Sequence, residues 1–284
     1  MGLRIQNNVE AFNTHRQLTA TSNMAGKSME KLSSGYRINR AADDAAGLAI
    51  SEKMRGQIGG LAQAQRNAQD GISLVQTAEG ALNEVHSMLQ RVRDLKVQYN
   101  NGTLSTDDKD AIAAEVSQIS GEIGNISTDT KFNGSSLLGG ATFSFQVGAN
   151  DNETIATSAV GLSNAVGVSG TGGVAELTGL STAALAKTAL DSGGLSTVAS
   201  IDNAIKNVSN ARGNLGAVQN RLEHRLNNLA TYQENLTASE SRIRDVDMAQ
   251  EMTKFTKLNI LQQAGTSMLA QANQAPQGVL SLLR

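Results

Sequence analysis

An apolar heptad repeat in the last third of the chain constrains its fold most strongly. Leucine, isoleucine or valine recurs every seven residues at Ile201, Val208, Leu215, Leu222, Leu229 and Leu236. The first half of the chain repeats this spacing at Leu61, Ala68, Val75, Leu82 and Leu89. Such a period is typical of helices that pack through one apolar stripe. Because a helix cannot bury its own stripe, we expect the two helices to pair and the chain to fold back on itself.

Composition favours long helices over a compact catalytic domain. The 284 residues include one proline, Pro276, and only 3% are aromatic. A proline within a helix costs about 3 kcal/mol, so its near-absence permits long uninterrupted helices. The sequence contains no cysteine, which excludes a disulfide, a thiolate metal site and a cysteine nucleophile. We therefore predict a mainly α protein, built as a long antiparallel coiled-coil-like helical bundle.

A third helix is predicted after residues 100–103, where Asn-Asn-Gly-Thr forms a turn. Ser105 is the expected N-cap, and Asp107, Asp108 and Asp110 favour the positive end of the helix dipole. Apolar positions then alternate at spacings of four and three, at Ile112, Val116, Ile119, Ile123 and Ile126. This pattern predicts an amphipathic helix that packs on the same core.

A small β-hairpin is predicted where the helical period is lost, between residues 128 and 200. Residues 142–147 alternate in polarity, residues 148–152 supply a turn, and residues 154–157 form the return strand. Phe143, Phe145 and Val147 are expected to face inward. Residues 161–194 are weakly patterned and are expected to form either a small exposed lobe or a mobile loop.

Two amphipathic stretches lie at the ends of the chain. The front stripe starts at Ile5, Val9 and Phe12, and the back stripe comprises Met252, Phe255, Leu258, Leu261, Met268 and Leu269. Polar linkers are expected at residues 33–44, with Gly35 as a helix C-cap, and at residues 239–247. Ordering each residue costs about 1–2 kcal/mol of backbone entropy. We therefore expect the ends to be loose in the monomer and to become ordered through self-association.

Catalytic, cofactor and metal sites are not predicted. The histidines His15, His86 and His224 form no His-Glu-x-x-His pair. Residues 167–173 are glycine-rich but lack the Gly-Lys-Ser/Thr that holds phosphates, and residues 107–110 lack the glycine and distant glutamate of an EF-hand. Dispersed basic residues without interleaved aromatics argue against nucleic-acid binding.

The sequence contains no apolar segment that approaches the roughly 20 residues needed to span a bilayer. Its first thirty residues also lack the basic-then-apolar order of a secretory signal. We therefore expect the chain either to stay in the cytoplasm or to leave the cell without a cleavable signal peptide.

Several runs of sequence occur in an order that is specific to one family. Residues 33–50 read Ser-Ser-Gly-Tyr-Arg-Ile-Asn-Arg-Ala-Ala-Asp-Asp-Ala-Ala-Gly-Leu-Ala-Ile, and residues 66–73 read Arg-Asn-Ala-Gln-Asp-Gly-Ile-Ser. Lys-Phe-Asn-Gly follows at 131–134, Phe-Gln-Val-Gly-Ala-Asn at 145–150 and Val-Leu-Ser-Leu-Leu-Arg at 279–284. These runs resemble bacterial flagellin, the subunit of the flagellar filament. The resemblance covers roughly residues 1–157 and 197–284.

The resemblance implies a division of the chain into regions of the filament. It implies an N-terminal inner-core helix and linker at 1–43, outer-core helices and the hairpin at 44–160, and a short exposed variable region at 161–196. The outer-core return helix is then 197–238, and a linker with the C-terminal inner-core helix is 239–284. The residues implied for inner-core assembly are Ile5, Val9, Phe12, Met252, Phe255, Leu261, Leu280, Leu282 and Leu283. The outer-core seam comprises Leu82, Leu89, Leu215, Leu222 and Leu229, and the supercoil-switching hairpin comprises Phe143, Phe145, Val147 and Ile155.

The resemblance also implies partners and a location. The chain would form a homopolymer outside the cell, after contact with a type III export apparatus and an export chaperone. Filament cap and hook–filament junction proteins would be further partners. A host Toll-like receptor would contact Arg91, Leu95 and Glu115, and a cytosolic immune receptor would contact the leucines of residues 280–283. Two alternatives remain open: a filament–hook junction adaptor that works in few copies, and a coiled-coil signalling or chaperone module that does not polymerise.

Overall fold

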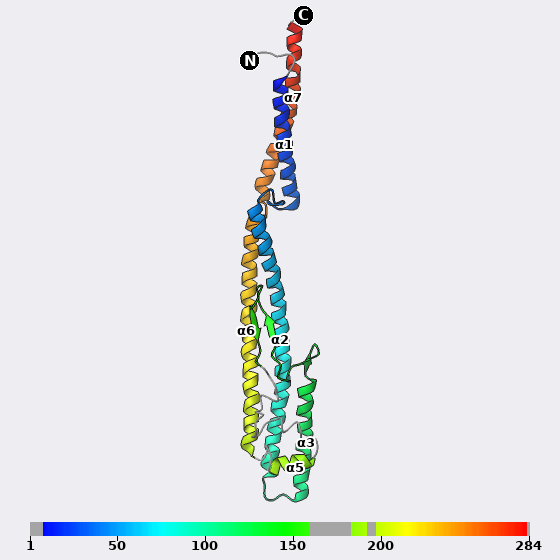
Figure 1. The fold of residues 1–284 in the computed structure, drawn as a ribbon, viewed down its shortest axis with the longest axis vertical. Coiled ribbons are helices and arrows are strands. Elements are labelled where there is room, and N and C mark those ends of the chain that lie inside the picture. The colour runs from blue at the N-terminus through cyan, green and yellow to red at the C-terminus, as the bar shows by residue number, and fades with distance from the viewer. Residues whose placement is uncertain (1–7, 159–182, 192–196, 283–284) are drawn as a thin grey trace. The chain divides into compact units, whose positions relative to one another are not determined.

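The computed structural model describes residues 8–158, 183–191 and 197–282, and side chains of the last helix are described up to Gln274. These residues form six helices and four short strands (Figure 1). The chain divides into two compact units. Unit 1 comprises Met1–Gln57 and Glu234–Arg284, and unit 2 comprises Ile58–Gln233.

Unit 1 is built around two helices from opposite ends of the sequence, α1 (Val9–Ser34) and α7 (Met248–Leu282), which lie side by side (Figure 1). Asn8 caps α1, since its side-chain Oδ1 accepts a hydrogen bond from the backbone N–H of Ala11 at 3.1 Å. Gly35 ends α1 with a φ of 75°, and its N–H donates to the Lys31 carbonyl at 2.9 Å. The predicted glycine C-cap is therefore confirmed.

The linkers of unit 1 hydrogen-bond to each other through their backbones. The N–H of Arg37 donates to the Arg244 carbonyl at 2.7 Å, and the N–H of Val246 donates to the Gly35 carbonyl at 3.0 Å. The second linker is shorter than predicted, because helix α6 (Val198–Arg244) continues past Ser239. The Ser239 hydroxyl bonds back to the carbonyl four residues earlier at 2.8 Å, so this serine does not interrupt the helix.

Unit 2 is organised by helix α2 (Ala45–Tyr99) and helix α6, which pack against each other through their apolar stripes. Two ion pairs show that they are antiparallel: Arg93 with Asp202 at 2.6 Å, and Glu79 with Arg212 at 3.7 Å. The heptad leucines of unit 2 are at most 3% exposed, namely Leu82, Leu89, Leu215, Leu222 and Leu229. The prediction of a mainly α bundle with a back-folded chain is confirmed.

Helix α3 (Thr106–Asp129) begins with a capping box. The Ser105 hydroxyl accepts from the N–H of Asp108 at 3.2 Å, and the Asp108 carboxylate accepts from the N–H of Ser105 at 3.0 Å. The Ser105 hydroxyl also donates to the Asp108 carboxylate at 2.8 Å, and this hydrogen bond together with that from the Ser105 N–H lowers the pKa of Asp108. Ile112, Val116 and Ile123 of this helix are buried in the core of unit 2, as the spacing predicts.

Two antiparallel hairpins follow α3. Strands β3 (Ser144–Gln146) and β4 (Thr154–Ala156) pair with Phe145 opposite Ile155, so the predicted hairpin is present, with strands shorter than the alternating run. Strands β1 (Lys131–Phe132) and β2 (Ser135–Ser136) form a second hairpin that the sequence analysis missed. Its turn residues Asn133 and Gly134 have φ values of 49° and 81°. This Asn-Gly pair is the strongest short hairpin signal and could have predicted it.

Helix α5 (Ala183–Asp191) lies within residues 161–196, for which the sequence left an exposed lobe and a mobile loop open. It packs against α3, and its residues Ala186, Ala189 and Leu190 are buried in the core of unit 2. The buried ammonium of Lys96 donates to the Leu190 carbonyl at 2.7 Å, and burial lowers the pKa of this lysine. The rest of 161–196 lies outside the described residues.

Candidate assembly surface

On α1, the face toward α7 consists mainly of small and polar residues, whereas α7 buries Leu258 and half-buries Phe255 and Leu269 of the predicted back stripe. The least exposed positions of α1 recur at alternating spacings of three and four: Ala11, Thr14, Leu18, Thr21, Ala25, Ser28 and Leu32. A Cβ added to Gly265 of α7 would lie 3.2 Å from the Leu18 side chain. The heptad is therefore present in α1, but small and hydroxyl-bearing residues conceal it from a search for apolar positions.

A buried hydroxyl contributes to the same contact. Ser28 is 1% exposed and its hydroxyl donates to the Glu251 carboxylate of α7. Burial opposes the charge of Glu251, but this hydrogen bond and the Lys254 ammonium at 3.4 Å outweigh it and lower the pKa of the carboxyl group. The α1–α7 pair is thus held partly by polar contacts, and it leaves large apolar residues unused.

These unused residues leave large apolar side chains exposed on unit 1. Phe12 is 70% exposed and Ile260 is 61% exposed, both higher than any other large apolar side chain of the described residues. The full set on α1 and α7 comprises Val9, Phe12, Met24, Met29, Met248, Met252, Ile260, Leu261 and Met268. We call these residues the apolar set. Where exposed large apolar residues adjoin one another, they are typical of surfaces that bind another macromolecule.

The structure separates the residues that the resemblance implied for inner-core assembly. Val9, Phe12, Met252 and Leu261 are exposed, whereas Phe255 is half-buried. Leu280 and Leu282 belong to α7, but their side chains lie outside the description, as do Ile5 and Leu283 entirely.

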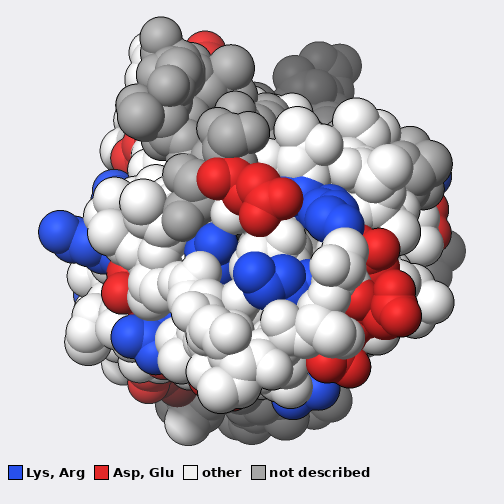
Figure 2. Space-filling view, turned by 90° about the horizontal axis from the view of Figure 1, so that it is seen from below, with Lys and Arg blue, Asp and Glu red and all other residues white. Residues whose placement is uncertain are grey.

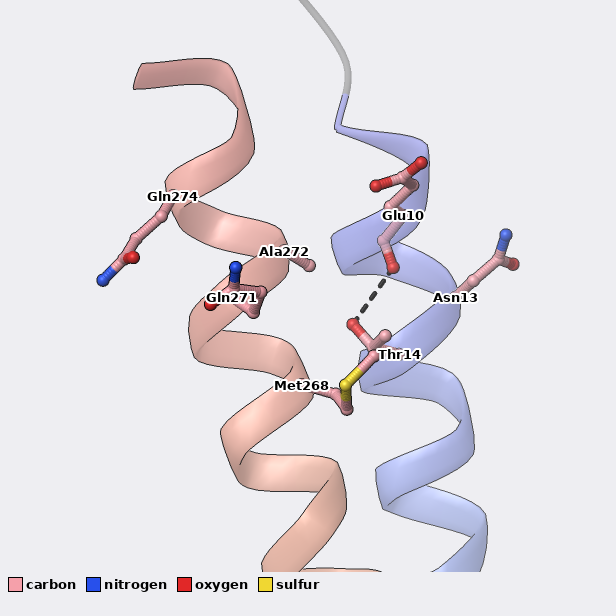
Figure 3. A pocket seen from close by; sticks show the side chains of 7 residues that line it. All are labelled: Glu10, Asn13, Thr14, Met268, Gln271, Ala272 and Gln274. Atoms are coloured by element: carbon pink, nitrogen blue, oxygen red, sulfur yellow. Dashed lines mark hydrogen bonds between the residues drawn. The ribbon is translucent and has the colours of Figure 1, made fainter. Parts of the chain in front are cut away.

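An open groove of about 620 Å³ lies between α1 and α7 near the end of the pair (Figure 3). It is lined by five residues with polar side chains, Glu10, Asn13, Thr14, Gln271 and Gln274, and by Met268 and Ala272. Close by, the Asn8 side-chain amide donates to the Ala272 carbonyl at 2.7 Å and ties the two helices together. No group of histidine and carboxylate side chains suited to a metal ion occurs within the described residues. The groove thus has neither a nucleophile–base pair nor a metal site, and its chemistry suits hydrogen bonding.

A second feature of unit 1 surrounds Arg244, whose side chain is only 12% exposed. Its Nη1 atom lies 2.6 Å from the Glu52 carboxylate and 3.2 Å from the Ser51 hydroxyl, and its guanidinium stacks 4.9 Å from the centre of the Tyr36 ring. The start of α2, the end of α6 and the first linker are therefore joined by one cation. The sequence analysis missed this residue, because nothing in a helical repeat distinguishes a buried arginine from a solvated one.

Gly47, near the start of α2, lies where the surrounding side chains leave no room for a Cβ atom. A Cβ added to Gly47 would lie 2.4 Å from the Asp44 carboxylate and 2.8 Å from Ile38, which is 1% exposed. Only glycine fits this position without a shift of the Asp44 and Ile38 side chains.

In unit 2 the β3–β4 hairpin is tied to both long helices. The Asn67 amide of α2 donates to the Gln146 carbonyl at 3.0 Å, and Arg225 of α6 donates to the Val147 carbonyl at 2.9 Å. Of the residues implied for the switching hairpin, Val147 and Ile155 are buried, and Phe143 and Phe145 are half-buried against the core.

The residues implied for receptor contact do not share one environment. Arg91 and Glu115 form an exposed ion pair at 2.7 Å. Leu95 is 1% exposed and belongs to the same buried cluster as Leu190 of α5. The Leu95 side chain is therefore covered in the free chain, and its contact with a receptor stays a prediction.

Charge is distributed without a dominant sign at the end of unit 2 that carries α5 and the α2–α3 turn. Figure 2 shows basic and acidic side chains interspersed on this face. Such a surface lacks the continuous basic stripe that nucleic-acid binding requires.

No helix within the described ranges has the length and apolar content that crossing a membrane demands.

Long helices paired by heptads, with large apolar residues exposed on the paired ends, are typical of a structural assembly protein. Residues 5–142 match the family described as the bacterial flagellin N-terminal helical region, and residues 198–283 match the bacterial flagellin C-terminal helical region. The chain belongs to the bacterial flagellin family, and it is a structural subunit of the flagellar filament.

Individual relatives agree with this assignment. Flagellin of Bacillus subtilis (strain 168) is 51% identical over 99% of this chain and 100% of its own length. Flagellin of Halalkalibacterium halodurans is 52% identical over 99% of both chains. Both alignments span the middle of the chain, whereas the two family models leave residues 143–197 unmatched. A structure of a putative flagellar hook-associated protein from Vibrio parahaemolyticus covers 72% of this chain and 100% of its own, with a TM-score of 0.60 and 15% identity, and shares the fold.

Proposed function

We propose that copies of this chain join into the filament through the apolar set of α1 and α7. The observation that carries the proposal is the exposure of Phe12, at 70%, on a helix whose own partner contact uses other residues. Burying a large apolar side chain contributes roughly 1.5–3 kcal/mol. Covering the apolar set with a second copy would therefore offset much of the entropy lost when subunits associate.

The location and the other partners follow from this role. An extracellular filament requires export, and an apolar set that is uncovered before assembly suits an export chaperone. We propose the type III export apparatus, the filament cap and the hook–filament junction proteins as further partners, and a host Toll-like receptor at the exposed Arg91–Glu115 pair. The apolar set supports a self-associating subunit over the coiled-coil module that does not polymerise.

We also infer that the β3–β4 hairpin helps to set the filament's supercoil. Its hydrogen bonds to Asn67 and Arg225 support this role, because a shift of the hairpin would be transmitted to both long helices. Filaments of an Arg225→Met variant should show a changed helical pitch by electron microscopy. An unchanged pitch would remove the hairpin from the account.

The assembly proposal is tested by polar substitutions that leave the subunit fold intact. Phe12→Ser and Ile260→Ser should each leave the melting temperature of the free subunit nearly unchanged and should suppress seeded polymerisation. Val97→Ser is the matched control, since Val97 is 53% exposed on α2 in unit 2. If both unit 1 variants polymerise like the control, the apolar set does not form the contact between copies.

A further inference from the structure

Methionines are concentrated on the exposed faces of α1 and α7. The chain has eight methionines, and those exposed on these two helices are Met24, Met29, Met248, Met252 and Met268. Their exposed fractions run from 48% to 58%. Met54 and Met88 of α2 are half-buried instead. We call the five exposed residues the methionine set.

These side chains suit a surface that must be soluble before assembly and covered after it. Methionine is flexible and polarisable, so it adapts to irregular contacts and is common at binding surfaces. The methionine set makes up more than half of the apolar set, and Met268 also lines the groove between α1 and α7 (Figure 3). A chemical change at these sulfurs would therefore alter the assembly surface more than it would alter the fold of the subunit.

Oxidation by a peroxide is such a change. The O–O bond of hydrogen peroxide breaks, an S–O bond forms at the thioether, the sulfur is oxidised and the peroxide is reduced to water, with no net release of a proton. The product sulfoxide is polar and disrupts methionine-rich interfaces, and sulfoxide reductases can reverse it. In the free subunit, oxidant can reach all five side chains.

We propose that the methionine set is an oxidation site that controls assembly. Sulfoxidation of the free subunit blocks filament growth, and assembly in turn protects the same five residues. This inference rests on the proposed function, because the set becomes covered only when α1 and α7 meet another copy.

The test compares free subunits and preformed filaments after treatment with hydrogen peroxide. Mass spectrometry locates the sulfoxides, and seeded polymerisation gives the critical concentration. Oxidised subunits should show at least a tenfold higher critical concentration, and treatment with methionine sulfoxide reductases should restore the original value. In filaments, the methionine set should be oxidised at least fivefold more slowly than in free subunits.

The control variant replaces each member of the methionine set by leucine, a swap that nearly conserves volume. After peroxide treatment it should polymerise like its untreated form. Oxidised wild-type chain that polymerises at its original critical concentration would overturn the proposal, and so would a treated leucine variant that fails to grow. If the untreated leucine variant does not grow, rescue of the oxidised wild type by the reductases decides instead. Untreated wild-type chain that never polymerises would refute the proposed function itself, which separates the two failures.

Discussion

Gly71 and Gly80 belong to the same helix, α2, but an added methyl group would meet different surroundings at the two positions. At Gly71 a Cβ would lie 3.1 Å from the Phe145 ring and 3.2 Å from Leu222, whereas nothing lies within 4 Å of a Cβ at Gly80. Alanine is favoured over glycine within a helix by about 1 kcal/mol. Gly80→Ala should therefore stabilise unit 2 by about that amount.

Gly71→Ala receives the same helical gain but forces the hairpin away from α2 and α6. Overpacking of this kind typically costs about 1–3 kcal/mol, so the variant should be neutral or destabilised by up to about 2 kcal/mol. For a unit of this size, 1 kcal/mol shifts the melting temperature by about 2–4 °C. Differential scanning calorimetry of free subunits should give Gly80→Ala a higher melting temperature than the wild type. The melting temperature of Gly71→Ala should be equal to or lower than that of the wild type. If both substitutions stabilised unit 2 equally, the Phe145 ring would not pack against α2 at Gly71, and the described position of the hairpin would be wrong.

Three further predictions concern other parts of the fold. Leu222→Ala should lower the free energy of unfolding by about 2–5 kcal/mol in urea titrations, because Leu222 is fully buried. Val97→Ala, at an exposed site, should change it by less than about 0.5 kcal/mol. Equal effects of the two substitutions would mean that the seam is misassigned. Burial, and then the hydrogen bond to Asp191 at 2.7 Å, raises the pKa of Tyr99 from 10.0 to about 12. The folded chain thus holds this proton more tightly, so the stability present below pH 10 should fall by about 2 kcal/mol as pH rises from 10 to 12. Tyr99→Phe should flatten this fall, and an unchanged slope would contradict the assignment. A chain that ends at Gln271 should keep the unfolding transition of unit 2 and should not polymerise, and normal filaments from it would refute a role for the end of α7.

The sequence predicted the long-range pairing of unit 2 because large residues carry that information. Leu82, Leu89 and Leu222 repeat at the heptad spacing and all are buried. Helix caps at Ser105 and Gly35 were also predictable, since each depends on one residue type at one position.

The α1–α7 contact was not predictable in the same way. Its α1 face consists largely of alanine, serine and threonine, so the apolar residues that suggested a stripe, Val9 and Phe12, are exposed in the structure. Helix α5 was missed for a related reason. Its burial depends on a hydrogen bond from Lys96, a residue more than ninety positions away, and on contacts with α3 that no local pattern encodes.

The buried Leu95 shows what a sequence motif leaves open about a single residue. The surrounding run of residues 89–95 matches the family, and Arg91 is at the surface. Yet the accessibility of Leu95 depends on what covers it, and in this chain it lies in one cluster with residues of α5. A sequence motif specifies the helix face but not the neighbour that packs on it.

Seeded polymerisation of the purified chain tests most directly the claim that its copies assemble through unit 1. The free subunit would be brought to high concentration in precipitating salt, short filament seeds would be added, and the products would be examined by negative-stain electron microscopy beside the Phe12→Ser variant. The account predicts long uniform filaments from the wild type and none from the variant. Persistently short or absent polymers from the wild type would contradict it and would favour a junction adaptor or a helical module that does not polymerise.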